Sequence, residues 1–189
     1  MFLEEYKGGA ELTTEAIIKS SPDSVGVEKV HCRSVSIDFL EKNKDSHFII
    51  CNFSTLADNL KIYMCRNVNY SIIEYDYKFC QYRSMKKHYA STGKECDCVD
   101  SYYGKINSAF YGYASKIWFM SRGQRDIFIS KIKALKEERC EVLSSVFSSG
   151  DVSFMNSIKN NEKNNKYLIL GSNSWIKGTD KCILYAEEN

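Results

Sequence analysis

The predicted fold depends most on two adjoining segments, Tyr113-Ala114-Ser115-Lys116-Ile117-Trp118-Phe119-Met120 and Ser121-Arg122-Gly123-Gln124. The first is rich in isoleucine, tryptophan and phenylalanine, which favour a β-strand. In the second, Ser121 and Gln124 have the spacing of a capping box, so Ser121 is predicted to cap a helix that runs from about residue 124 to 139. That helix would place three apolar residues on one face: Phe128, Ile132 and Leu135.

The residues beyond this helix predict a repetition of the same pattern. Residues 140–147 read as another strand, and the turn at 148–151 opens a second helix. Two final strands are expected at 167–170 and 182–186. The resulting order, β-α-β-α-β-β, predicts an α+β fold with a mixed, largely antiparallel sheet and two or three packed helices.

The N-terminal half is predicted to add strands to the same sheet. Four segments rich in valine, isoleucine, phenylalanine and tyrosine have this character: residues 30–39, 47–53, 61–65 and 69–77. Residues 1–26 are expected to form a loosely attached segment with a short helix capped by Thr13, because Pro22 disfavours a longer one. Residues 27–189 would then form a single domain.

Composition excludes several classes of protein. The 189 residues are 43% hydrophobic, which is too high for a disordered chain, and 26 Lys and Arg against 24 Asp and Glu give a net charge of only +2. This balance disfavours a dedicated nucleic-acid binder. No apolar run is long enough to span a membrane, and the acidic N-terminus does not resemble a signal peptide. We therefore expect a cytoplasmic protein, of the producing cell or of a target cell, whose 8 cysteines are reduced.

Three cysteines and one histidine form a candidate metal site. Cys80, His88, Cys96 and Cys98 have the spacing C-x7-H-x7-C-x-C within a polar, irregular region. Thiolates and imidazole are the ligands that zinc prefers, and four protein ligands would make the site structural. Two other interpretations remain open at this point. These residues are ordinary loop cysteines beside an exposed His88, or Cys96 and Cys98 form a redox pair.

Cysteine and histidine also suggest nucleophilic catalysis. His31 as base and Cys96 as nucleophile are the candidates. The order of a strand bearing His31, the acidic strand Ile73-Glu74-Tyr75-Asp76-Tyr77 and the later Cys96 resembles that of the YopJ-type acetyltransferases. The resemblance lacks the acidic residue that this family has on its second strand, and no Cys-Gly pair leads into an apolar helix.

The turn Ser121-Arg122-Gly123-Gln124-Arg125 is a candidate anion site, because the start of a helix presents free N–H groups. Together with the order β-α-β-α-β-β, this turn resembles the C-terminal half of the GCN5-related N-acetyltransferases. That resemblance implies binding of acetyl-CoA through its pyrophosphate. Arg125 and Ile127 stand where the family has small residues, and their side chains would crowd the phosphate.

An aromatic run provides a candidate binding surface. The tyrosines that we expect to contact a partner are Tyr102, Tyr103, Tyr111 and Tyr113. Tyrosine is enriched at the energetically important positions of protein interfaces, and the small net charge makes a protein a better partner than a nucleic acid. The alternative is that these residues are part of a strand core.

The sequence therefore predicts a non-catalytic protein-binding module, of the immunity, effector or anti-defence type. It would use an aromatic surface, bind no membrane, and carry either no cofactor or a structural zinc ion. The alternative is an acyltransferase, dependent either on acetyl-CoA or on a Cys/His pair.

Overall fold

The computed structural model of the chain describes residues 8–162, 169 and 179–188, which fall into two compact units, 1–148 and 149–189. Each unit is considered by itself. The first contains these elements: α1 (Gly9–Lys19), α2 (Ile37–Lys42), β1 (His47–Ile50), α3 (Asp58–Asn67), β2 (Asn69–Glu74), α4 (Met85–Thr92), α5 (Tyr102–Tyr113), β3 (Ile117–Phe119), α6 (Arg122–Lys131) and β4 (Cys140–Val142). Three short 3-10 helices add to these: η1 (Cys32–Ser34), η2 (Cys98–Asp100) and η3 (Glu137–Arg139). The second unit contains α7 (Ser149–Ile158) and α8 (Thr179–Glu188). The predicted boundary at residue 26 stays a prediction.

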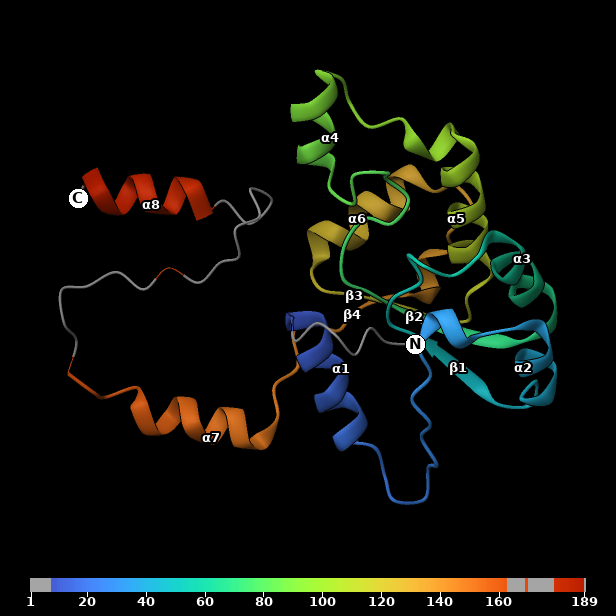
Figure 1. Cartoon of the computed structure of the whole chain (residues 1–189), viewed down its shortest axis with the longest axis horizontal. Coiled ribbons are helices and arrows are strands. Elements are labelled where there is room, and N and C mark those ends of the chain that lie inside the picture. The colour runs from blue at the N-terminus through green and yellow to red at the C-terminus, as the bar shows by residue number, and fades with distance from the viewer. Residues whose placement is uncertain (1–7, 163–168, 170–178, 189) are drawn as a thin grey trace. The chain divides into compact units, whose positions relative to one another are not determined.

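The four strands form one parallel sheet in the order β1-β2-β3-β4 (Figure 1). Its register pairs Ile50 with Ile72, and Ile72 with Ile117. The prediction of a largely antiparallel sheet with two or three helices is therefore wrong, since the fold is α/β and the described residues contain eight α-helices. Parallel neighbours need a long crossover, and helices supply each of these connections.

Among the helices that the sequence analysis did not predict, α2, α3 and α5 have apolar residues that are also strand formers. Ser36 caps α2 by accepting a hydrogen bond from the Phe39 N–H (3.1 Å), so the strand predicted at 30–39 is instead the 3-10 helix η1 followed by the start of α2. In α3, which was predicted as a strand at 61–65, the buried Leu60 and Met64 are four residues apart. In α5, Asn107 and Phe110 are buried three residues apart. These spacings are helical.

Of the C-terminal predictions, the helix cap at Ser121 is confirmed and the strand at 182–186 is wrong. Ser121 caps α6 as expected, because its Oγ accepts a hydrogen bond from the Gln124 N–H (3.1 Å). Residues 182–186, predicted as a strand, belong to α8, and the predicted strand at 167–170 lies outside the described residues. The order β-α-β-α-β-β is therefore absent, and with it the topology on which the likeness to the GCN5-related N-acetyltransferases depended.

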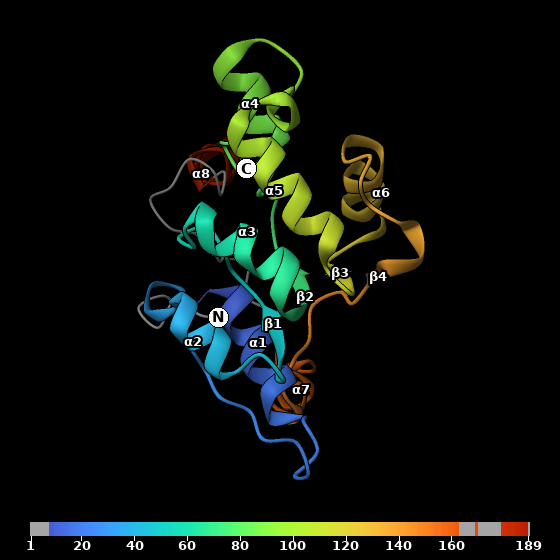
Figure 2. The same cartoon turned by 90° about the vertical axis from the view of Figure 1, so that its right-hand side faces the viewer.

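Three crossover helices cover one face of the sheet (Figure 2). On this face Cys65 of α3 contacts the Tyr70 hydroxyl (3.5 Å), and that hydroxyl donates a hydrogen bond to the Phe110 carbonyl of α5 (2.7 Å). Phe128 of α6 packs against Phe119 of β3. The other face carries Ile73, which lines a cavity together with residues of α1. Among the described residues, no helix is long and apolar enough to cross a membrane.

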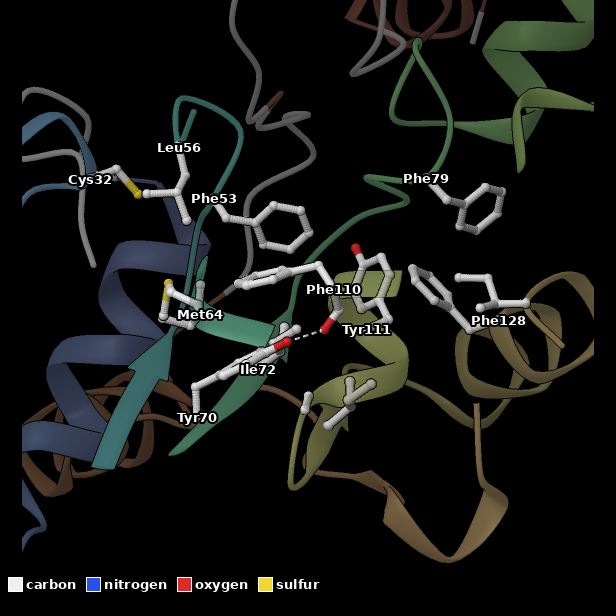
Figure 3. Packing of buried hydrophobic residues seen from close by; sticks show 14 of the residues in the cluster. Cys32, Phe53, Leu56, Met64, Tyr70, Ile72, Phe79, Phe110, Tyr111 and Phe128 are labelled. Carbon is white, nitrogen blue, oxygen red and sulfur yellow. Dashed lines mark hydrogen bonds between the residues drawn. The ribbon is translucent and has the colours of Figure 1, made fainter. Parts of the chain in front are cut away.

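Aromatic rings fill the space between the sheet and these helices (Figure 3). Tyr70 stacks on Phe110 with ring centroids 4.6 Å apart, and Phe53 meets both Phe110 and Tyr111 edge to face. Such pairs add about 0.5–1.5 kcal/mol each beyond the burial of their area. Tyr111 extends the cluster to Phe128, so one aromatic layer joins α5 and α6 to β2.

A charged network is buried at the carboxyl end of β2. Lys78 Nζ donates to Glu74 Oε1 (2.8 Å) and lies 3.2 Å from Asp76 Oδ1, while the Tyr111 hydroxyl donates to the other oxygen of Glu74. Arg83, with a left-handed φ of 54°, pairs with Asp76. Burial raises the pKa of Glu74 to about 7, although the Lys78 ammonium opposes this shift.

Helix α1 begins five residues earlier than predicted. Its N-cap is Gly8, and Thr13, predicted as the cap, is buried within the helix. The neighbouring Thr14 hydroxyl forms a hydrogen bond with the Tyr75 hydroxyl (2.8 Å), which attaches α1 to the end of β2.

The shifted pKa of Glu74 makes the stability of the fold depend on pH. The carboxyl pKa is about 7 in the folded protein and 4.5 in the unfolded chain, so the folded state keeps the proton to a higher pH. The contribution of Glu74 to the free energy of unfolding should therefore fall as pH rises from 4.5 to 7. Glu74→Gln cannot ionise, and we expect it to lose less stability than the wild type between these pH values.

Urea unfolding of both proteins across this range measures the effect. The exposed Glu138→Gln, whose side chain lies outside the network, should retain the wild-type pH dependence. Parallel curves for the wild type and Glu74→Gln would show that Glu74 titrates normally.

Candidate metal centre

The connection from β2 to α5 reverses direction after α4, so its last residues lie beside its first. Cys80 follows the buried Phe79, and Ser84 then caps α4, which carries His88. Helix α4 ends at Gly93, whose φ of 69° is a left-handed conformation that glycine adopts without strain. The chain therefore reverses after α4 and brings Cys96 and Cys98 back towards His88.

The four donor atoms of Cys80, His88, Cys96 and Cys98 all lie within 4.8 Å of one another. His88 Nδ1 is 3.3 Å from Cys98 Sγ and 3.7 Å from Cys80 Sγ. All four side chains are buried, with 6% exposure at most. The structure thus brings together every residue of the predicted metal site, and it does not place His88 at the surface.

The distances from His88 Nδ1 to two of the sulfur atoms fit one tetrahedral ion. With zinc bonds of about 2.3 Å to sulfur and 2.0–2.1 Å to nitrogen, tetrahedral geometry puts N and S about 3.6 Å apart and two S atoms about 3.8 Å apart. The two distances from His88 Nδ1 bracket the first value. The donor set of three thiols and one imidazole is that of structural zinc sites, and all four positions are supplied by the protein.

Several groups surround the donors. His88 presents Nδ1 to the sulfur atoms. Its Nε2 lies 4.0 Å from a carboxylate oxygen of the exposed Asp97, which is beyond hydrogen-bond distance. The Tyr82 ring packs edge-on against the imidazole. Lys131 of α6 donates to the Cys96 carbonyl (3.1 Å), which attaches the cluster to the neighbouring helix.

Cys96 is buried among the four donors, and burial raises the pKa of its thiol to about 12. His31 is not a member of the cluster, and its Nδ1 accepts a hydrogen bond from the Arg33 N–H (3.1 Å). All eight cysteines are free thiols, as expected for reduced residues.

The turn 121–125 has internal partners. The buried Gln124 accepts a hydrogen bond from the Met120 N–H (2.8 Å) and donates one to the Asp76 carbonyl (2.9 Å). Arg125 pairs with Asp126, whereas Arg122 and Gly123 are exposed. This turn therefore joins α6 to the charged network at the end of β2.

The four tyrosines of the predicted binding surface separate into two groups. Tyr102 and Tyr113, at the two ends of α5, are 72% and 63% exposed. Tyr111 is buried in the aromatic core and is not available to a partner, and Tyr103 is partly buried beside the Lys61 ammonium.

A cavity of about 700 Å³ lies elsewhere in the first unit. It is lined by residues of α1, the segment 25–30, α2 and β1, and by none of the predicted site residues.

Several structurally important residues were not predicted from the sequence. They include the charged side chains of Glu74, Asp76 and Lys78, although charges spaced two apart within an aromatic strand are an unusual signal. Asp97 and Lys131, which contact the metal cluster, have no such signal because only the fold brings them to it.

Comparison of the chain with models of protein families, with curated proteins and with solved structures finds no match. The metal cluster is therefore interpreted from its own geometry.

The backbone at Cys98, one of the four candidate metal ligands, packs against the start of α5. A Cβ atom added at Gly104 would lie 1.7 Å from the carbonyl oxygen of Cys98. The helix backbone therefore packs directly on residues 80–98, which carry the four donors and which we call the metal loop. The Ser101 hydroxyl reinforces this contact by donating to the same carbonyl (2.6 Å).

Replacing Gly104 with alanine tests this contact. We expect Gly104→Ala to lower the free energy of unfolding by about 1–3 kcal/mol, because the added methyl group must displace backbone. Gly123→Ala in α6 is the matched control, since nothing lies within 4 Å of its added Cβ, and it should leave stability unchanged or raise it. Urea unfolding measures both. Equal stabilities of the two variants would contradict the close packing at Gly104.

Proposed function

We propose that this chain is a zinc-braced, non-catalytic protein-binding module. Zinc, held by Cys80, His88, Cys96 and Cys98, would fix the connection between β2 and α5, and the exposed tyrosines of α5 would contact a partner protein.

The observation that carries the proposal is the convergence of four buried donors. Ordinary loop cysteines are not required to meet, yet the donor atoms of three thiols and one imidazole lie within 4.8 Å. They come from a connection that is polar on average and contributes one large apolar side chain, Phe79, to the core. Its other buried side chains are Lys78, Cys80, His88, Cys96 and Cys98. A connection with so few buried apolar side chains would be ordered by metal binding, because apolar burial alone stabilises it little.

A structural role for the metal is favoured over a catalytic one. A catalytic zinc site keeps one position open for water or substrate, whereas here the protein supplies all four. The ligands are buried, so a substrate has no direct access to them.

The metal loop is coupled to the proposed binding surface through α5. The Cys98 carbonyl packs against Gly104 in the first turn of this helix, and Tyr102 stands in the same turn. Ordering of Cys98 by zinc would therefore hold the helix that carries Tyr102 and Tyr113.

Metal analysis tests the zinc site. Protein purified without chelator should contain about one equivalent of zinc, because a Cys₃His set binds a single tetrahedral ion. Cys98→Ser should reduce this below about 0.2 equivalents and lower the melting temperature. Cys140→Ser replaces a buried cysteine outside the cluster, so it should retain the metal while it loses some packing.

The wild-type protein supplies the decisive comparison. Treatment with a chelator should lower its melting temperature, and added zinc should restore it. Wild-type protein that neither contains zinc nor is stabilised by it would refute the proposed bracing.

A further inference from the structure

Helices α3 and α5 lie side by side on the sheet and share one outer face (Figure 2). Lys61 in the first half of α3 donates to Asn107 in the middle of α5 (3.0 Å), which joins the two helices. Their buried residues point to the sheet, so the opposite sides of both helices face outwards. We call this surface the α3–α5 face and define it by six exposed residues: Ile62, Arg66, Tyr102, Lys105, Ala109 and Tyr113.

The centre and ends of the α3–α5 face are apolar or aromatic. Tyr102 and Tyr113 are eleven positions apart, which is about three helical turns, so they stand on the same side of α5. Ala109 separates them with a small side chain, and Ile62 adds an exposed aliphatic group (40%) from α3. Tyrosine and arginine are the residue types that most often dominate the energy of a protein interface.

The charge of the α3–α5 face has one sign. Arg66 and Lys105 are exposed, and neither forms an ion pair with a described residue. The sequences of α3 and α5 contain one acidic residue, Asp58, and its carboxylate is engaged by the Lys61 ammonium (3.0 Å) at the end of α3. The face thus presents two cations and no acidic side chain of its own.

We propose that the α3–α5 face binds an acidic segment of another protein. Carboxylates of that segment would pair with Arg66 and Lys105, and apolar or aromatic side chains between them would pack on Tyr102, Tyr113 and Ile62. The inference deepens the protein-binding function proposed above and rests on it.

A protein fits this face better than a nucleic acid does. Single-stranded nucleic acid is bound in a groove with cations along its whole backbone, together with aromatic platforms. The α3–α5 face has two cations on two convex helices, and the whole chain has a net charge of only +2. Two cations are enough to favour a partner of negative charge over one of positive charge, and such selection is the usual role of charge at a protein interface.

Peptide selection on the zinc-loaded wild-type chain tests the proposal. A random-peptide phage library should yield peptides that are enriched in aspartate and glutamate with apolar residues between them. The dissociation constant of a labelled selected peptide is then measured by fluorescence anisotropy. We expect Tyr102→Ala with Tyr113→Ala to weaken binding at least about tenfold, and Arg66→Glu with Lys105→Glu to weaken it as much or more.

Matched variants place the binding on this face. Tyr89→Ala in α4 and Lys133→Glu after α6 also remove an exposed tyrosine and reverse an exposed cation, and they should leave the dissociation constant unchanged. Zinc content and melting temperature are measured for every variant, so a variant that has lost its fold is recognised, and the Arg66→Glu single variant then replaces it.

Three results would overturn the proposal: no acidic peptide selected, equal binding by the wild type and the Tyr102/Tyr113 variant, or tighter binding of an oligodeoxythymidine than of any selected peptide. Each of these leaves the zinc measurement intact. Absence of zinc with retained peptide binding would instead remove the bracing and keep the face.

Discussion

Three thiols and one imidazole meet inside the β2–α5 connection, and the positions of α4 and of the start of α5 depend on this constraint. That connection must carry the chain from the end of one strand to the start of a crossover helix, and much of it is polar. Its direction is set by a left-handed glycine at residue 93 and by the donors that this reversal brings together. The start of α5 then follows from the position of Cys98, whose carbonyl leaves no room for a side chain at residue 104.

The charged network at the end of β2 is the second part of the same arrangement. Lys78 belongs to this network and Cys80 belongs to the metal cluster, so only Phe79 separates the one from the other. Gln124 at the start of α6 holds the Asp76 carbonyl, and Lys131 at its end holds the Cys96 carbonyl. Helix α6 therefore spans both features. The carboxyl ends of parallel strands are where α/β proteins usually carry their functional loops, and here the metal loop starts at that edge.

The sequence was informative where one residue type has one structural meaning. The capping serine at 121, the strands at β1 and β2, and the four donors of the metal cluster were all found from local patterns. The fold class was not found, because the aromatic residues of α5 and the mixed apolar residues of α3 are read as strand formers unless burial shows their helical spacing. Without those helices the strands had short connections, and short connections imply antiparallel pairing. Contacts such as Lys131 with Cys96 join residues far apart in the chain, and no local pattern encodes them.

The central claim is that one zinc ion is bound by three sulfur atoms and one nitrogen atom of this chain. X-ray absorption at the zinc edge of the purified protein measures that coordination directly. The account predicts a first shell of three sulfur atoms at about 2.3 Å and one nitrogen at about 2.0 Å, with the outer-shell scattering of a single imidazole. A shell of oxygen and nitrogen atoms, or a second metal within bonding distance of the sulfur atoms, would contradict it.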